Sequence, residues 1–195
     1  LASGIDYDKL GVPGEAEFFG KGIGSSSLSY SHLFYGKTVF VTGNGMRTIE
    51  AAAELKMQVE KLVLHMEEVS EDCFSDLNRL KEEENVQIVQ GGKIERFSGE
   101  IYAEKVQIRD KRGNFTEIPA DAFFIERECR GNIDYVRHLI GHTEADRVTI
   151  DTRNRSSLSG IFAAGDLTAV YAEQILIAVG EGIKAALSCY EYLRN

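Results

Sequence analysis

The chain has 195 residues, of which 43% are hydrophobic and 27% are charged, and its formal net charge is −9. This composition predicts a globular chain with a hydrophobic core, folded as one domain or two small ones. No run of Lys or Arg is present to neutralise a phosphate backbone, so we expect no nucleic-acid partner. No apolar run approaches the roughly 20 residues that span a bilayer, so we expect no membrane partner.

The cysteines and histidines predict neither a disulfide framework nor a metal site. Cys73, Cys129 and Cys189 are far apart in the sequence, and no Cys-x-x-Cys pair or Cys/His ligand spacing occurs. A reduced, cytoplasmic setting is the simplest interpretation of three widely spaced cysteines.

In chain order, residues 1–12 resemble the end of an earlier segment, and residues 13–36 are rich in glycine and serine with few helix or strand cues. A βαβ unit is predicted next, because a short apolar run precedes a stretch of good helix formers and a second apolar run. Its predicted parts are a strand at 39–41, a helix at 47–57 and a strand at 61–65.

Further elements follow the βαβ unit. Apolar residues at three-residue steps predict an amphipathic helix over 71–84, and the alternation of polar and apolar residues over 93–118 predicts a β-meander or hairpin with a turn at 110–114. Short apolar runs predict strands at 86–89, 122–125 and 160–166, and the last helix is predicted from about Ala172 to Leu193. Alternating strands and helices with an antiparallel insert indicate an α/β nucleotide-binding architecture.

The segment Gly43-Asn-Gly-Met-Arg-Thr48 lies between the first predicted strand and helix, where dinucleotide-binding loops lie. In such a loop Gly43 would form the tight turn, and Gly45 would let the backbone approach a pyrophosphate held at the helix amino terminus. Thr48 takes the third position, which requires a small side chain where the helix meets the strand. The alternative is a tight turn in a Rossmann-like domain that binds no nucleotide.

The second predicted strand ends in His65-Met-Glu-Glu68. An acidic residue there accepts hydrogen bonds from the ribose hydroxyls, whereas arginines there bind the extra phosphate of NADPH. Glu67 and Glu68 would repel a 2′-phosphate, so NADH is the favoured nicotinamide cofactor. The alternative is that both carboxylates lie in a solvated loop.

Several segments of the chain resemble parts of the low-molecular-weight thioredoxin reductases. They are 11–15 and 19–22 before the first strand, the loop and helix at 43–55, and the carboxy-terminal stretches 160–166, 178–186 and 190–193. The resemblance implies a Rossmann-like nicotinamide-nucleotide domain inserted in a discontinuous FAD-binding domain, of which only part is present. Residues 1–12 would end the amino-terminal FAD segment, 13–119 would form the NAD(P)-binding-like domain, and 120–195 the carboxy-terminal FAD segment.

The same resemblance assigns FAD contacts and an assembly. Gly165 and Asp166 would meet the ribityl-phosphate region of FAD, while Gln174 and Ile175 would lie near its isoalloxazine ring. Members of this family form homodimers, so a homodimer is implied here as well.

The chain departs from the family pattern at its redox centre. The positions that match the family's Cys-x-x-Cys and following Asp are Ser26 to Ser29 and Tyr30. Thiol–disulfide exchange requires a thiolate, so these positions cannot reduce thioredoxin. The family's paired arginines correspond to Met66 and Glu67, and its Gly-His-x-Pro-Asn stretch corresponds to 126–132.

Three functions are compatible with these residues. The first is an FAD-dependent, thioredoxin reductase-like oxidoreductase that uses NADH and an unknown, non-thiol electron acceptor, for which no catalytic side chain is named because the cofactor carries the chemistry. The second is a non-catalytic nucleotide-binding or regulatory relative. The third is an engineered or truncated thioredoxin reductase in which serines replace the two cysteines.

Overall fold

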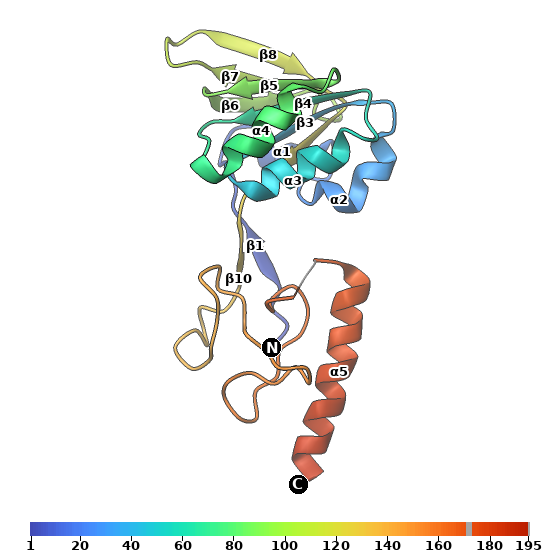
Figure 1. The fold of residues 1–195 in the computed structure, drawn as a ribbon, viewed down its shortest axis with the longest axis vertical. Helices are drawn as coiled ribbons and strands as arrows, with labels where there is room; N and C mark the ends of the chain where they lie inside the picture. The colour runs from blue at the N-terminus through green and yellow to red at the C-terminus, as the bar shows by residue number, and fades with distance from the viewer. Residues whose placement is uncertain (171–172, 195) are drawn as a thin grey trace. The chain divides into compact units, whose positions relative to one another are not determined.

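The computed structural model describes residues 1–170 and 173–194. The chain divides into two compact units, one formed by Leu1–Asp8 with the carboxy-terminal part from Glu128, the other by Lys9–Arg127 (Figure 1). The boundaries of these compact units lie at 8/9 and 127/128, whereas the boundaries expected for the nucleotide-binding domains lie at 12/13 and 119/120. The second boundary moves because residues 122–125 form a central strand of the 9–127 unit.

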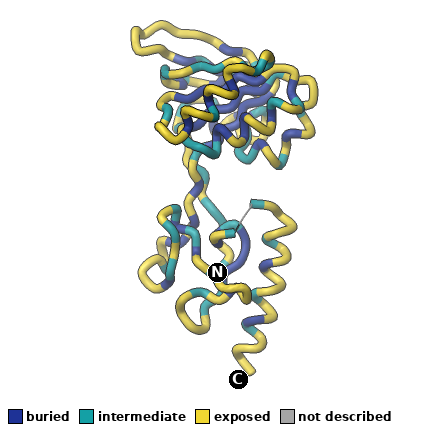
Figure 2. Tube along the Cα trace, in the orientation of Figure 1, coloured by how far each residue is buried: buried dark blue, intermediate teal, exposed yellow. Residues whose placement is uncertain are grey.

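A five-stranded parallel sheet forms the centre of the 9–127 unit. Its strand order is β2 (Ile23–Gly24), β9 (Ala122–Ile125), β3 (Thr38–Gly43), β4 (Lys61–Met66) and β5 (Val86–Gln90). Figure 2 shows that buried residues are concentrated in the interior of this unit, where β3, β4 and β9 are almost entirely buried. Both faces of β3, β4 and β9 are covered, which explains why these strands are continuous apolar runs in the sequence.

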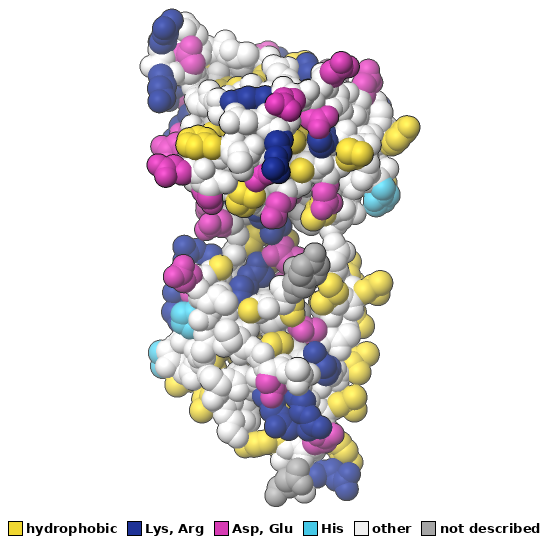
Figure 3. Space-filling view, viewed as in Figure 1, with side chains coloured by type: hydrophobic (Ala, Val, Ile, Leu, Met, Phe, Trp, Pro, Cys, Tyr) yellow, Lys and Arg dark blue, Asp and Glu magenta, His cyan; other side chains and the backbone are white. Residues whose placement is uncertain are grey.

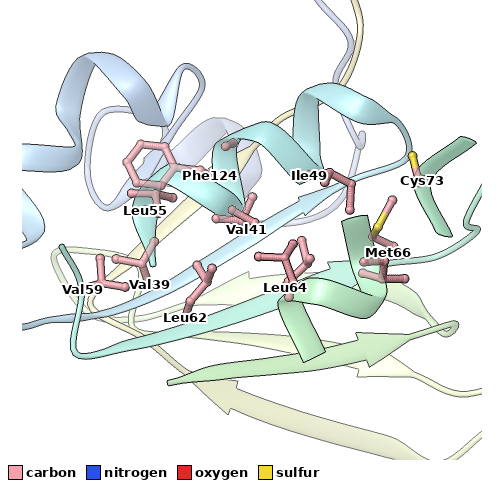
Figure 4. Close-up of a cluster of buried hydrophobic side chains, with 14 of the residues drawn as sticks. Val39, Val41, Ile49, Leu55, Val59, Leu62, Leu64, Met66, Cys73 and Phe124 are labelled. Carbon is pink, nitrogen blue, oxygen red and sulfur yellow. The ribbon is translucent and has the colours of Figure 1, made fainter. Parts of the chain in front are cut away.

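Helices cover one face of the sheet. They are α3 (Met46–Leu55), the short 3₁₀ turn η2 (Glu71–Cys73) and α4 (Phe74–Lys81). The apolar face of α3 packs on β3 and β4 in one core cluster, with Ile49 and Leu55 pointing toward strand residues such as Val41 and Leu64 (Figure 4). The helix expected over 71–84 is therefore present, with a 3₁₀ first turn and an end at Lys81.

An antiparallel meander covers the other face. Its strands are β6 (Lys93–Ser98), β7 (Lys105–Arg109) and β8 (Phe115–Pro119), paired in the order β6-β7-β8. Phe97, Val106 and Ile118 pack with Phe40 and Val63 of the parallel sheet in a second core cluster. The alternation in the sequence is explained by this packing, because one side of the meander is buried and the other faces solvent.

Residues 13–36, which have few helix or strand cues in the sequence, form short helices. They are α1 (Glu15–Phe18), α2 (Ser27–Tyr30) and the 3₁₀ turn η1 (Ser31–Phe34). The Glu15 carboxylate fixes the chain before α1, because it accepts hydrogen bonds from the backbone N–H of Leu10 at 3.0 Å and of Gly11 at 2.7 Å. Four-residue helices are too short to give a periodic pattern, so the sequence could not reveal them.

The other unit is built from the two ends of the chain. Strand β1 (Ile5–Tyr7) pairs antiparallel with β10 (Cys129–Gly131), and a small core forms around Ile133, Val148 and Leu167. The strand expected at 160–166 is absent, because only an isolated bridge joins Phe162 to Arg155. Backbone hydrogen bonds tie that segment to Leu1 instead.

Helix α5 (Ile175–Arg194) ends this unit. It confirms the last predicted helix, although the predicted start at Ala172 lies outside the described residues. Its apolar stripe faces solvent, as Figure 3 shows by the hydrophobic side chains along the helix, and Ile175 is 83% exposed. The residues that α5 buries are Glu181 and Ser188.

Candidate functional site

The predicted nucleotide loop lies where the sequence placed it, between the carboxyl end of β3 and the amino end of α3. Gly45 stands at the N-cap position of α3, and no side chain caps the helix by a hydrogen bond. The first amides of a helix have no intrahelical acceptor. An anion at this end would therefore meet uncapped N–H groups and the positive end of the helix dipole.

Gly43 is required for a reason other than the expected tight turn. Its φ angle is not in the positive range, so the turn itself does not demand glycine. A Cβ at this position would lie 2.0 Å from Thr48 Oγ1 and 2.3 Å from the carbonyl oxygen of Glu126. Gly43 thus allows the end of β3 to pack against α3 and the end of β9.

Gly45 and Thr48 fit a working loop. A Cβ on Gly45 would meet no atom within 4 Å, so the backbone there is open to an approaching group. Thr48 is fully buried, and its hydroxyl donates a 2.8 Å hydrogen bond to the carbonyl oxygen of Glu126. Threonine is therefore compatible with close packing at the third position, because its hydroxyl oxygen has a partner.

A cleft of about 390 Å³ opens outside the carboxyl ends of β3 and β4. In open α/β sheets ligands bind in this place. Gly43 and Glu67 line it together, whereas Gly45 and Thr48 are not among its lining residues. Its wall is formed by Leu10, Val12, Thr42, Gly43, Asn44, His65, Glu67, Glu68, Lys93, Ile94 and Arg127.

The charges around this cleft have both signs. Glu67 and Glu68, expected at the ribose, are exposed at the end of β4. Lys93 and Arg127 bring positive charge to the same cleft, and no sequence pattern marked either of them as a site residue. They are distant from the loop along the chain, so only the pairing of the strands reveals that they share a site.

His65 is a third residue that the sequence patterns did not place among the site residues. Its ring is buried, lies 5.9 Å from the Phe40 ring in a stacked arrangement, and reaches Thr42 Oγ1 at 2.9 Å and the Gly92 carbonyl at 3.2 Å. Burial lowers the pKa of His65 from its ordinary value of 6.5, although the backbone hydrogen bonds act in the opposite direction. A neutral ring would donate from Nε2 to Gly92 and accept from the Thr42 hydroxyl at Nδ1.

Glu126 places a buried carboxylate beside the loop. Oε1 accepts from the backbone N–H of Ser27, and Oε2 accepts from Arg47 Nε at 3.0 Å. The side chain is only 3% exposed. The sequence marked residue 126 only as part of a stretch that departs from the family pattern, with no sign of these partners.

The serines that the resemblance places at the family's dithiol positions lie close together. Ser26 Oγ and Ser29 Oγ lie 3.0 Å apart at the amino end of α2, and Ser26 adopts a left-handed backbone with a φ of 65°. Cys73, Cys129 and Cys189 do not form disulfide bonds. Among the described residues, no group of His, Cys, Asp and Glu is arranged to hold a metal ion.

The predicted FAD residues belong to the other unit. Gly165, with a φ of +80°, donates its N–H to Glu181 Oε2 at 3.0 Å, and the Thr168 hydroxyl reaches the same oxygen at 3.0 Å. A Cβ on Gly165 would lie 3.4 Å from the Cβ of Ala178, so this turn rests directly on α5. Glu181 lies in the stretch 178–186 that resembles the family but was not predicted to be a site residue, and it connects the turn to the helix.

Asp166 is half-buried in this turn, and its carbonyl oxygen accepts from Arg147. Burial raises the pKa of the Asp166 carboxyl; the nearby Glu173 also raises it, and Arg147 lowers it. Gln174 and Ile175 lie at the exposed start of α5.

Known proteins resemble this chain over nearly its whole length. The model of the pyridine nucleotide-disulphide oxidoreductase family matches residues 1–182. The chain belongs to this family. It is 32% identical to an alkyl hydroperoxide reductase component from Pseudomonas aeruginosa over 201 residues, which cover 99% of the chain and 38% of that protein.

Solved structures of the family share the fold. A thioredoxin reductase from Streptococcus pyogenes matches with a TM-score of 0.91 at 25% identity, over 99% of this chain and 64% of that one. A thioredoxin reductase from Giardia duodenalis matches with a TM-score of 0.87 at 24% identity, over 100% and 65% of the two chains.

Membership implies that a flavin and a nicotinamide nucleotide are the cofactors. The chain spans 38% of the length of the curated relative described above and about two thirds of these solved chains. Within the described part of the chain, no helix is both long and apolar enough to cross a membrane.

Proposed function

We propose that this chain supplies the nicotinamide-nucleotide unit, and part of the flavin unit, of an oxidoreductase similar to thioredoxin reductase. The cleft at the carboxyl ends of β3 and β4 carries the proposal, because Gly43 and Glu67 meet there beside the uncapped start of α3. This arrangement offers a pyrophosphate the helix amides and a ribose the carboxylate. Electrons would pass from NADH through FAD to an acceptor that is not a disulfide.

The residues near α5 are compatible with a flavin. Gly165 brings backbone against Ala178, and Gln174 and Ile175 lie exposed at the start of the helix. FAD, when bound, supplies the redox chemistry, and the protein positions it. Gly165 and Asp166 would hold its ribityl-phosphate region, while Gln174 and Ile175 would lie near its ring. Hydride transfer itself needs no acid or base from the chain.

The acceptor is proposed to be a non-thiol because Ser26 and Ser29 stand at the dithiol positions. Their hydroxyls form a hydrogen bond to each other and cannot form a disulfide. A cytoplasmic homodimer is the proposed setting and assembly, and sedimentation equilibrium of the longest natural form of the protein tests the dimer.

The proposed use of NADH rests on Glu67 and Glu68. Both carboxylates are exposed at the cleft and would repel the 2′-phosphate of NADPH. Replacing both by Gln should improve the NADPH dissociation constant about tenfold while changing that of NADH little. Fluorescence titration of each nucleotide measures both constants. The double variant Glu71→Gln/Asp72→Asn changes exposed acids outside the cleft lining. It should leave the ratio of the NADPH and NADH dissociation constants unchanged.

A second candidate is a non-catalytic nucleotide-binding or regulatory relative. The observation that favours it is the buried Glu126 carboxylate, which binds the loop residue Arg47 and adds negative charge where phosphates would bind. The visible spectrum of the longest natural form, recorded without oxygen, separates the two functions. An enzyme should be yellow and should bleach with NADH. A yellow protein that neither nucleotide bleaches favours the second candidate, and failure to bind added FAD contradicts the first.

A further inference from the structure

Glu126, at the end of β9, is a negative charge enclosed by the 9–127 unit. Its side chain is 3% exposed, and its oxygens accept from the Ser27 amide and from Arg47 Nε. Burying a carboxylate is unfavourable unless donors replace its water. The Ser27 amide and Arg47 replace the hydrogen bonds that water would donate to the carboxylate, and they hold it in a defined position.

The donors around Glu126 are of the kind that bind external anions. A backbone N–H and an arginine guanidinium are common partners of carboxylates and phosphates in proteins. Arg47 lies inside the predicted nucleotide loop, between Gly45 and Thr48. The backbone of Glu126 reaches the same loop, because its carbonyl oxygen accepts from Thr48 Oγ1 at 2.8 Å. Both the side chain and the main chain of Glu126 are therefore tied to the loop.

We propose that Glu126 is a built-in anion that occupies Arg47 and sets the affinity of the neighbouring loop for the pyrophosphate of a dinucleotide. The effect on affinity rests on the proposed function, whereas the anion site formed by Arg47 and the Ser27 amide does not. Glu126 lowers the affinity in two ways. It adds a negative charge beside a site for phosphates, and it neutralises the arginine that the loop contributes.

The first test concerns the anion site alone. Glu126→Ala removes the carboxylate and leaves Arg47 and the Ser27 amide without this acceptor, so the melting temperature should fall. Sodium formate should restore it in a saturable manner, beyond the effect of sodium chloride at the same concentration, because formate fits the vacated position. The wild-type chain and Glu50→Ala, which changes an exposed acid on α3, should show no such recovery. Equal effects of formate and chloride on Glu126→Ala would overturn the anion site.

The second test measures nucleotide affinity in a variant that keeps the size of the side chain. Fluorescence titration of Glu126→Gln with NADH should give a dissociation constant about fivefold lower than that of the wild type. Glu50→Gln is the matched control and should bind as the wild type does. The gain should disappear in Arg47→Ala/Glu126→Gln, because the liberated guanidinium is then missing.

The outcomes separate this inference from the proposed function. Wild-type binding of NADH with unchanged or weaker binding by Glu126→Gln overturns the role of Glu126 in affinity and leaves the proposed function standing. Failure of every variant to bind NADH overturns the proposed function and that role together. Formate recovery in Glu126→Ala then still establishes the anion site, since it requires no nucleotide.

Discussion

In the 9–127 unit, the burial and the hydrogen-bond partners of single polar residues are determined by neighbouring strands and turns. His65 is an ordinary strand residue in the sequence, yet the fold buries its ring on Phe40 and gives both nitrogens a partner. Thr48 departs from the usual small residue, yet its hydroxyl has an acceptor. For single residues, a buried polar side chain is compatible with the fold when each of its polar atoms has a hydrogen-bond partner.

His65 should make stability depend on pH. Burial lowers the pKa of its ring in the folded chain, so the neutral form is favoured there. As pH falls below about 6.5, the unfolded chain takes up the proton first and the free energy of unfolding decreases, by at most about 1.4 kcal/mol per pH unit for one group. Urea unfolding at several pH values measures this. His65→Gln should flatten the profile, and a similar flattening by His32→Gln, whose side chain is exposed, would contradict the assignment.

The two loop glycines should respond differently to alanine. Gly43→Ala forces a Cβ against Thr48 and the Glu126 backbone, so it should cost about 2–3 kcal/mol of stability. Gly45→Ala meets no atom within 4 Å and keeps an allowed, extended backbone, so stability should change by less than about 1 kcal/mol. If the loop binds a pyrophosphate, Gly45→Ala should still weaken NADH binding, because the Cβ blocks the approach. Urea unfolding and NADH titration of both variants give the two results.

At the scale of elements, helix α5 shows how a periodic pattern predicts a helix but not its buried face. Its apolar positions step by three and four along the chain, yet Ile175, Val179 and Ile183 are exposed. One buried contact of the helix is polar: Glu181 accepts from Gly165 and Thr168, in addition to the ring contact of Tyr192 with Phe162. A charged residue in the helix is therefore the link to the turn that carries the predicted flavin residues.

Glu181→Ala should loosen that link. The Gly165 N–H would lose its acceptor, at a cost of about 1–3 kcal/mol for a buried donor left unpaired, whereas the Thr168 hydroxyl would keep the Gly165 carbonyl oxygen at 2.8 Å. Amide hydrogen exchange should accelerate at Gly165, which donates to the carboxylate. Lys184→Ala, an exposed change on the same helix, should leave the exchange rates as they are. Unchanged exchange in Glu181→Ala would show that backbone contacts alone hold the turn.

On the scale of the whole molecule, the core clusters divide as the units do. The two large clusters contain only residues of the 9–127 unit, and they lie on opposite faces of its parallel sheet. The third cluster contains only residues of the other unit and is smaller. Burial of apolar surface is the main favourable contribution to folding. The 9–127 unit should therefore have the larger free energy of unfolding when each unit is isolated.

Residues 9–127 expressed alone should therefore fold. Circular dichroism with urea titration should show a single cooperative transition, because the piece keeps both large clusters and every strand of its two sheets. Residues 128–195 alone should not fold cooperatively, since they lose β1 and keep little of their apolar surface buried. A cooperative transition in the second piece, or none in the first, would contradict this division.

Local sequence patterns were sufficient to predict the βαβ unit, the meander, the last helix and the place of the nucleotide loop. These features follow from short-range periodicity and turn residues, which a segment expresses whatever lies elsewhere in the chain. The resemblance also places serines at the family's dithiol positions, which stays a prediction. The resemblance in turn indicated the family, which the comparison confirmed.

Only the tertiary structure, in contrast, shows which residues distant in the sequence lie at the same site. Strand pairing brings Lys93 and Arg127 to the cleft with Gly43 and Glu67, and it buries the Glu126 carboxylate against Arg47. The segment 160–166, expected to be a strand, instead forms an isolated bridge to Arg155 and backbone hydrogen bonds to Leu1 and Asn154, which are distant or irregular partners that no local pattern indicates. Hydrogen-bond partners and burial depend on residues far along the chain, and no local pattern records them.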